Sequence, residues 1–152
     1  MLSSTGHTME DREWLKSQIA RELDLIMVAA KHSRFIRDEE GRPIAHYTLM
    51  NRWGLYELTT VVVDPKHQGK GISHQIIENC ENPVCSFTKN ERLAKALTKA
   101  GFKEAWWPGF FPFINMMFER HFRVLQMIFL LQWKRCFHQC LNLFNYRMYI
   151  RK

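Results

Sequence analysis

A run of β-branched residues that ends in a glycine-rich segment constrains this chain more than any other feature. Residues 55–63 (Leu-Tyr-Glu-Leu-Thr-Thr-Val-Val-Val) are typical of a strand, and Asp64-Pro65 ends it. Residues 67–73 (His-Gln-Gly-Lys-Gly-Ile-Ser) follow, and residues 73–80 predict a helix. A strand, a glycine-rich turn and a helix can together hold an anionic group, because the first amides of a helix have no partner within it.

Two well-known phosphate-binding patterns do not match this segment. The nucleoside-triphosphate loop needs four residues between its glycines and then Gly-Lys-Ser/Thr, and the dinucleotide fingerprint needs Gly-x-Gly-x-x-Gly. Here Gly69 and Gly71 enclose one lysine, Lys70. The two glycines let the backbone approach anionic oxygens closely, and Lys70 adds a positive charge.

The flanking segments predict an α/β (α+β) fold. Thr8 and Asp11 have the spacing of a capping box at the start of a helix. Asn90 is a typical helix cap, and Gly101 a typical terminator. The predicted segments are a helix over 10–30, a hairpin of 34–37 with 43–49, a strand over 83–88, a helix over 90–100, and strands over 102–107 and 114–118.

In their order, these features resemble the GNAT family of N-acetyltransferases. The family signature is a strand ending in Val-x-Pro, then Gln/Arg-x-x-Gly-x-Gly/Ala. This chain has Val63-Asp64-Pro65 and Gln68–Ser73, with Ser73 in place of the last small residue. The resemblance extends to Gly101-Phe102, where the family's next helix ends. It implies an acyl-CoA N-acyltransferase fold, which is a mixed, mostly antiparallel sheet flanked by helices.

The resemblance also implies acetyl-CoA as co-substrate. The pyrophosphate would lie on the amides of the glycine-rich loop, and the pantetheine arm would pair with the backbone of the preceding strand like an added strand. The residues expected to bind it are Val61, Val63, Gln68, Gly69, Lys70, Gly71, Ile72, Ser73 and Asn90. The implied reaction is direct transfer of the acetyl group to a primary amine.

Amine acetylation requires a deprotonated nucleophile. The resemblance makes Glu57 the first candidate for the general base, because it lies eight residues before Pro65, where the histone-acetylating branch of the family has its glutamate base. Tyr56 and His46 are weaker candidates. The family commonly protonates the leaving thiolate with a tyrosine, but the corresponding residue here is Leu97, which cannot donate a proton. Thr88, Tyr56 or water could replace it. Leu97 therefore keeps a second hypothesis open, a weakly active or inactive acyl-CoA-binding or interaction module.

Charge is distributed unevenly along the chain. The 22 lysines and arginines outnumber the 15 acids, for a net charge of +7, yet every acid lies at or before Glu119. Seven bases and no acid follow that residue. The excess charge thus belongs to the carboxyl-terminal part, which argues against a nucleic-acid partner for the main body. We divide the chain into a GNAT-like domain, residues 1–120, and a basic, aromatic-rich helical extension, residues 121–152.

The extension needs something to cover it. Residues 121–133 are apolar on nearly every face, so a helix there would be covered by the domain, by a second copy in a homodimer, or by a membrane surface. The bases form no continuous stripe, which favours packing or self-association over a membrane. Cys136 and Cys140 are one helical turn apart, but His138 points elsewhere and no fourth ligand is evident, so no metal site is expected.

Four cysteines and no apolar leader at the start of the sequence favour reduced thiols and a cytoplasmic protein. Neither the first helix region nor residues 106–113 carries an interpretable acceptor motif. The family resemblance implies an acceptor that is a small molecule or peptide carrying an amine.

Overall fold

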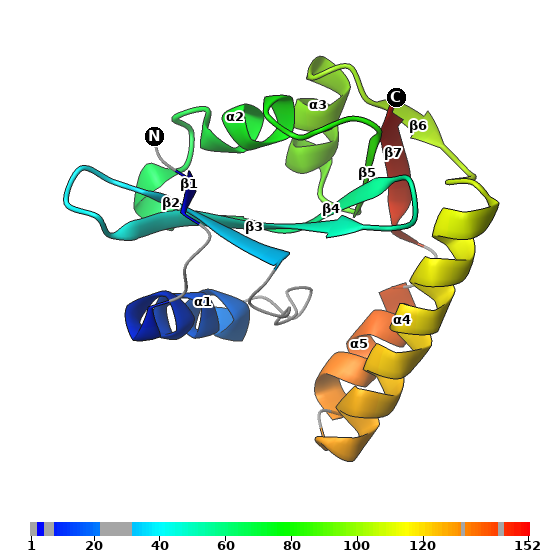
Figure 1. Cartoon of the computed structure of the whole chain (residues 1–152). Coiled ribbons are helices and arrows are strands. Elements are labelled where there is room, and N and C mark those ends of the chain that lie inside the picture. Colours follow the sequence, from blue (N-terminus) through cyan, green and yellow to red (C-terminus); the bar gives the residue numbers. More distant parts are fainter. Residues whose placement is uncertain (1–2, 5–7, 22–31, 132, 143–144) are drawn as a thin grey trace.

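The structure, a computed structural model, describes residues 3–4, 8–21, 32–131, 133–142 and 145–152. It contains a seven-stranded sheet in the order β1-β2-β3-β4-β5-β7-β6 (Figure 1). The elements are β1 (Ser3–Ser4), α1 (Met9–Arg21), β2 (Ser33–Arg37), β3 (Pro43–Asn51), β4 (Tyr56–Val63), α2 (Ile72–Glu78), β5 (Val84–Thr88), α3 (Glu91–Lys99), β6 (Lys103–Ala105), α4 (Phe110–Phe129), α5 (Trp133–Asn142) and β7 (Arg147–Arg151), with the 3₁₀ turn η2 (Pro65–His67) after β4.

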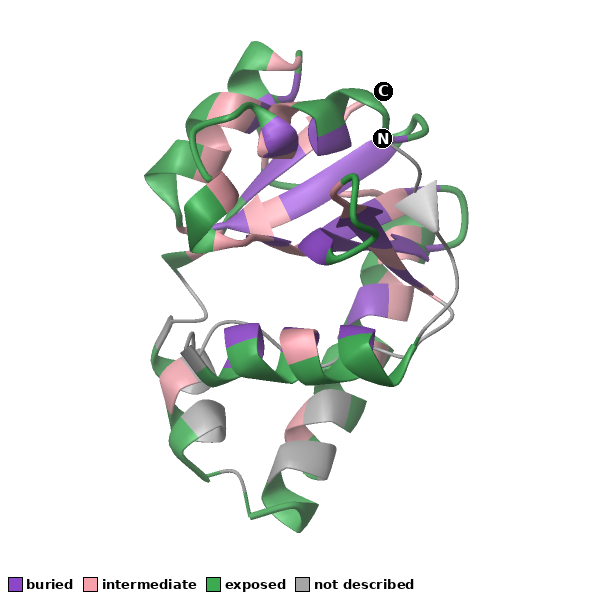
Figure 2. Cartoon of the chain, turned by 90° about the vertical axis from the view of Figure 1, so that its left-hand side faces the viewer, coloured by how far each residue is buried: buried purple, intermediate pink, exposed green. Residues whose placement is uncertain are grey.

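All strand pairs are antiparallel except β4 with β5. Helices α2 and α3 cover one face of the sheet, and α1 and α4 lie against the other (Figure 1). The strands are mostly buried and the outer faces of the helices exposed (Figure 2). The predicted fold class, a mixed and mostly antiparallel sheet flanked by helices, is confirmed.

Local sequence signals position the first helices as expected. The backbone N–H of Thr8 donates to Asp11 Oδ2 at 2.8 Å and that of Asp11 donates to Thr8 Oγ1 at 3.1 Å, so the predicted capping box forms. Arg37 on β2 also donates to both oxygens of Asp11 at 2.7 Å. Burial raises the pKa of Asp11, but the hydrogen bonds from Thr8 and Arg37 outweigh it and hold the pKa below its usual range. The second half of the helix predicted over 10–30 lies outside the described residues.

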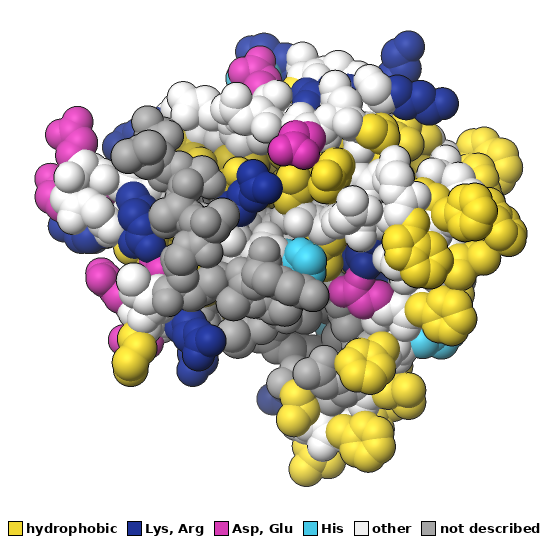
Figure 3. Space-filling view, in the orientation of Figure 1, with side chains coloured by type: hydrophobic (Ala, Val, Ile, Leu, Met, Phe, Trp, Pro, Cys, Tyr) yellow, Lys and Arg dark blue, Asp and Glu magenta, His cyan; other side chains and the backbone are white. Residues whose placement is uncertain are grey.

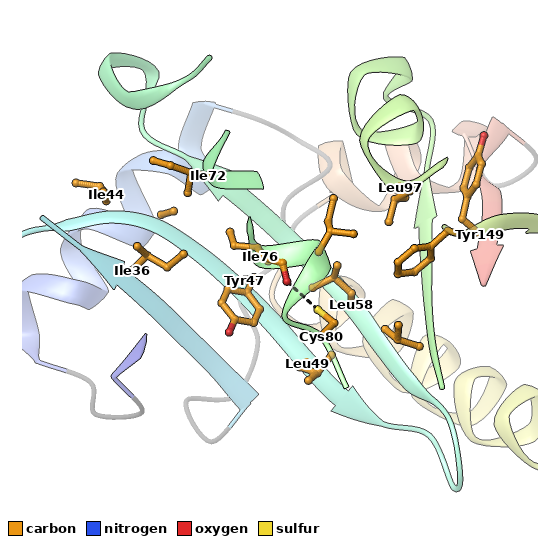
Figure 4. Packing of buried hydrophobic residues seen from close by; sticks show 14 residues of the cluster. Ile36, Ile44, Tyr47, Leu49, Leu58, Ile72, Ile76, Cys80, Leu97 and Tyr149 are labelled. Atoms are coloured by element: carbon orange, nitrogen blue, oxygen red, sulfur yellow. Dashed lines mark hydrogen bonds between the residues drawn. The ribbon is translucent and has the colours of Figure 1, made fainter. Parts of the chain in front are cut away.

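The main core lies between the sheet and the helices α2 and α3. Ile72 and Ile76 of α2 and Leu97 of α3 pack onto Leu49 and Leu58 of the central strands (Figure 4). Each of these side chains is buried. Ile72 is the first residue of α2, so its burial anchors the start of that helix on the sheet beside the end of β4.

The segment after β6 differs from the prediction. Residues 114–118, predicted as a strand, belong to α4, which begins after Pro108-Gly109 and continues to Phe129. A short apolar run does not by itself distinguish a strand from a helix. Here Asn115 and Glu119 are one helical turn apart, so the helical conformation brings both side chains into contact with Arg52.

The carboxyl-terminal strand completes the sheet. β7 pairs with β5 on one side and with β6 on the other, although its residues lie within the predicted helical extension. Arg151 of β7 donates to Cys80 O at 2.7 Å and its guanidinium lies 5.0 Å from the Phe102 ring centroid. Helix α4 runs without interruption across residue 120. Within the described residues, no helix is long and apolar enough to cross a bilayer.

Candidate active site

The central strands separate at the middle of β4. β4 and β5 pair in parallel over only three residues, Tyr56–Leu58 against Val84–Ser86. At the last pair, Ser86 Oγ donates to Leu58 O at 3.0 Å. Beyond this point residues 59–63 have no ladder partner on the β5 side in the described part of the chain. One edge of β4 is therefore open over its carboxyl-terminal half.

A β-bulge at Thr60 determines which backbone groups face this opening. Relative to β3, the register shifts by one residue between Thr59 and Val62, and Thr60 has a φ of 51°. Before the bulge, the Tyr56 N–H points toward β5, where it donates to Pro83 O at 2.9 Å. After it, the Asp64 N–H donates to Ile44 O at 2.9 Å on the β3 side.

Backbone N–H groups alternate between the two edges of a strand. Since Asp64 points toward β3, the backbone groups of Val61 and Val63 face the open edge. Gln68 Nε2 donates to Val63 O at 3.2 Å, so the side chain of Gln68 already occupies one of these groups.

The glycine-rich loop follows directly. Gly69 and Gly71 have φ values of 79° and 77°, in the left-handed region that favours glycine. Asp64 accepts from the Lys66 N–H at 2.9 Å and thereby caps the preceding 3₁₀ turn. Gly71 is the N-cap of α2 and supplies no side chain to its amides.

The loop amides are available to a ligand. Among the described residues, no protein atom accepts a hydrogen bond from the backbone N–H groups of residues 69–74. The next amide, that of Gln75, donates to Gly71 O at 3.0 Å. Gly69, Lys70 and Gly71 are exposed. A Cβ added at Gly69 or Gly71 would meet no atom within 4 Å, so the space above the loop is empty of protein. This geometry suits an anionic, oxygen-rich group.

Asn90 is the N-cap of α3 and follows the end of β5, and Leu97 lies in the last turn of α3. Asn90 Oδ1 accepts from the N–H groups of Arg92 at 2.9 Å and Leu93 at 3.2 Å, so the predicted cap is confirmed. Thr88 Oγ1 accepts from the Asn90 N–H at 2.9 Å. Leu97 is fully buried in the main core. Leu97 therefore packs in the core at the position where the family commonly has a tyrosine.

Glu57 is one member of a buried ion-pair network. Arg52 Nε donates to Glu57 Oε2 at 2.6 Å, and both side chains are about seven per cent exposed. Arg52 Nη1 also contacts Asn115 Oδ1 at 3.1 Å and Glu119, both on α4. Arg52 belongs to none of the sequence motifs described above. A signal was present, since the tight turn between β3 and β4 places residues 52 and 57 near each other across the hairpin.

Tyr56 and Glu57 lie on opposite faces of the sheet, as neighbours on a strand must. Tyr56 packs against the core under α2 and α3, and Glu57 faces α4. His46 is on the same face as α1, fully buried, with its ring centroid 4.8 Å from that of Phe35 and Nδ1 3.2 Å from Thr60 O. The three candidate acid–base groups therefore do not converge on one point.

The cysteines near the opening are buried thiols. Burial raises the pKa of Cys85 to about 12 and that of Cys80 to about 11. Both remain protonated at neutral pH, so neither is a ready nucleophile. Within the residues that the structure describes, no group of three or more His, Cys, Asp or Glu side chains could hold a metal ion.

Comparisons with known proteins agree with this geometry. The sequence model of the acetyltransferase (GNAT) family matches residues 5–106. Rv2747 from Mycobacterium tuberculosis, solved with CoA and NLQ, has a TM-score of 0.66 at 17% identity. The match covers 100% of this chain and 99% of Rv2747. The N-acetylglutamate synthase from Neisseria gonorrhoeae, solved with coenzyme A and N-acetyl-glutamate, has a TM-score of 0.62 at 11% identity. That match covers 99% of this chain and 34% of the synthase, so the chain spans about a third of its length. No curated protein matches the sequence.

Proposed function

The chain belongs to the acetyltransferase (GNAT) family, and from this premise we propose that it transfers an acetyl group from acetyl-CoA to a primary amine. The family supports acyl transfer from CoA in general. The observation that carries the finer proposal is the set of loop amides over residues 69–74 beside the open edge of β4. A diphosphate fits the first feature, and an amide-bearing arm fits the second.

In this proposal the loop amides and Lys70 hold the pyrophosphate, and the backbone of Val61 and the Val63 N–H pair with the pantetheine arm. Gln68 stabilises the strand end through Val63 O. The helix cap uses the side-chain oxygen of Asn90, so its amide nitrogen, Nδ2, is available to the co-substrate. These roles account for every residue expected to bind acetyl-CoA.

Transfer proceeds by direct attack. The amine nitrogen bonds to the acetyl carbonyl carbon, the carbon–sulfur bond breaks, and the coenzyme A thiolate leaves with the electron pair. We assign the amine proton to Glu57, directly or through water, on the face toward α4. We assign the proton that the thiolate takes up to Tyr56, on the opposite face of the strand, or to water. A thiol with a pKa of about 8.5 is also a tolerable leaving group without assistance.

The acceptor in this proposal is a small molecule or peptide with a primary amine. The N-acetylglutamate synthase, whose structure holds N-acetyl-glutamate, shares the fold and supports an amine acceptor of this class. Among the described cysteines, Cys80 and Cys85 are free thiols, which agrees with a reducing, cytoplasmic compartment.

Calorimetric titration of the purified chain with acetyl-CoA tests the binding half of the proposal. Saturable binding is expected, and no binding at millimolar ligand would refute it. Release of free thiol in the presence of a panel of amines tests the transfer half. A Cys85→Ser variant should retain transfer, because the proposed reaction has no acyl-enzyme intermediate.

A second candidate function is a non-catalytic module that binds acyl-CoA. Leu97, buried in the core at the usual position of the proton donor, favours it. Saturable acetyl-CoA binding with no thiol release from any amine would support this function instead of transfer.

A further inference from the structure

His46 is a buried histidine that the proposed reaction does not use. Its side chain lies on the face of β3 that α1 covers, with the ring centroid 4.8 Å from that of Phe35. Most of the large exposed apolar side chains gather elsewhere, along α4 and α5 (Figure 3). Burying a polar ring among apolar side chains is unfavourable unless the ring is hydrogen-bonded, so the hydrogen bond of His46 indicates its role.

The partner of His46 is the backbone of the bulge in β4. Nδ1 of the ring lies 3.2 Å from Thr60 O. A carbonyl oxygen only accepts, so Nδ1 carries the hydrogen of this bond. In the ladder His46 is opposite Val62, two residues beyond Thr60. The side chain therefore ties β3 to the bulge and not only to its own ladder partner.

Thr60 adopts a backbone conformation that its side chain disfavours. Its φ of 51° lies in the left-handed region, which a β-branched residue rarely adopts. A residue in such a conformation persists only where the surrounding structure holds it there. The hydrogen bond from His46 is a contact of this kind, because it fixes the Thr60 carbonyl through a side chain of the neighbouring strand.

The bulge sets the direction of the backbone groups that follow it on β4. The Tyr56 N–H points toward β5 and the Asp64 N–H toward β3, although an unbroken strand would point both toward the same edge. The one extra residue of the bulge accounts for the reversal. Without it, the N–H groups of Val61 and Val63 would point toward β3 instead of the open edge.

We propose that His46 is a positioning residue for the co-substrate, because its hydrogen bond to Thr60 O holds the bulge that turns Val61 and Val63 toward the open edge. The inference rests on the proposed function, in which that edge pairs with the pantetheine arm of acetyl-CoA. Loss of the hydrogen bond should weaken the binding of this arm more than that of the diphosphate. With Nδ1 engaged in this way, His46 has a role other than that of a general base.

A pair of His46 variants tests the proposal by calorimetry. His46→Leu keeps an apolar side chain beside Phe35 but has no donor, and it should lose at least about tenfold in acetyl-CoA affinity. His46→Asn places an amide N–H close to the position of Nδ1 and should stay within about threefold of the parent. Phe35→Leu disturbs the same cluster without removing the donor to Thr60, so it is the matched control and should bind acetyl-CoA like the parent.

The ligand can be divided as well. 3′-Phospho-ADP carries the diphosphate of coenzyme A without the pantetheine arm, so in the proposed site it contacts the glycine-rich loop alone. His46→Leu should bind it within about twofold of the parent, because the loop is separate from the hydrogen bond that is lost.

Thr60→Gly tests the link between the two residues. Glycine adopts a positive φ without strain, so the bulge in this variant depends less on the hydrogen bond from His46. His46→Leu should therefore lose less acetyl-CoA affinity in the Thr60→Gly background than in the parent, which a double-mutant cycle measures.

Amide hydrogen exchange reports on the bulge without any ligand. In the parent, the amides of Val61 and Val63 should exchange quickly at the open edge, and that of Asp64, bonded to Ile44 O, slowly. His46→Leu should reduce this contrast and His46→Asn should restore it. A parent chain that binds no acetyl-CoA would refute the proposed function, and the exchange pattern would still decide whether His46 holds the bulge.

Three results would overturn the proposal. One is a folded His46→Leu variant that keeps either the acetyl-CoA affinity or the exchange pattern of the parent. The second is an equal loss of affinity for acetyl-CoA and 3′-phospho-ADP, which would assign His46 to the stability of the whole fold. The third is a His46→Asn variant that loses as much as His46→Leu, which would assign the ring to packing and not to its hydrogen bond.

Discussion

The two halves of β4 differ in what surrounds them. At residues 56–58 the strand is paired on both sides, and Glu57 is buried in an ion pair with Arg52. At residues 59–63 one edge is open, and the strand leads into a loop whose amides have no protein acceptor among the described residues. The first half is completed by distant side chains, whereas the second half is left for a ligand.

The comparison distinguishes the part of the site that is formed by neighbouring residues from the part that depends on distant ones. The loop is shaped by its own glycines, which reach φ values that other residues rarely adopt. The surroundings of Glu57 depend on Arg52 in a neighbouring turn and on Asn115 and Glu119 in α4. A change in the ion-pair network should therefore affect folding, and a change in the loop should affect only binding.

Replacing Arg52 should have the largest effect. Arg52→Gln leaves Glu57 and Glu119 without their shared cation, and the free energy of unfolding should fall by about 3–5 kcal/mol. Chemical denaturation measures the loss. Arg52→Lys, which keeps a cation but not the forked geometry, should lose less.

The exposed ion pair of Arg42 provides the control. Arg42 contacts Asp38 and Glu40 in the β2–β3 turn, so Arg42→Gln should leave the denaturation midpoint nearly unchanged. Equal losses in Arg52→Gln and Arg42→Gln would contradict the distinction between the two halves of β4. In the folded state, Arg52→Gln should still bind acetyl-CoA within about threefold of the parent.

Glu57→Gln separates the proposed catalytic role from the ion pair. If Glu57 accepts the amine proton, kcat/KM should fall by about 10²-fold or more while acetyl-CoA affinity is retained. A loss of stability with an unchanged kcat/KM would instead assign Glu57 to the ion-pair network alone.

Gly71→Glu tests the open half of the strand and its loop. The substitution places a carboxylate where the proposed pyrophosphate lies, so acetyl-CoA affinity should fall by well over tenfold, which is more than about 1.4 kcal/mol. Calorimetry gives the dissociation constant. Gly41→Glu is matched to it, because Gly41 has a φ of 80° and also has nothing within 4 Å of an added Cβ. If both variants bound acetyl-CoA equally well, the loop would not be the diphosphate site.

Asn90 should have the smallest effect. Asn90→Ala removes the α3 cap, and the free energy of unfolding should fall by about 1 kcal/mol. Asn90→Asp keeps the capping oxygen and removes the amide donor, so it should retain stability and lose acetyl-CoA affinity several-fold. An unchanged affinity in Asn90→Asp would remove Asn90 from the proposed binding set without touching its role as a cap.

Local signals predicted much of the fold. The capping box of Thr8 and Asp11, the cap at Asn90 and the strand through Val63 all form as expected, because each depends on residues within a few positions of one another. The prediction failed at 114–118, where an apolar run carries no period long enough to distinguish a strand from a helix. The helical conformation of these residues depends on their contact with Arg52, which is more than sixty positions away in the sequence.

The strand, the glycine-rich loop and the helix that follows are predictable from the sequence, because their conformations arise from φ preferences, caps and β-branched side chains within one short segment. In contrast, long-range packing places β7 between β5 and β6, pairs Glu57 with Arg52, and turns the phenylalanines of α4 outward. These outcomes depend on which distant surfaces bury each other. The packing contacts that stabilise them join residues far apart in the sequence, so no local pattern predicts them.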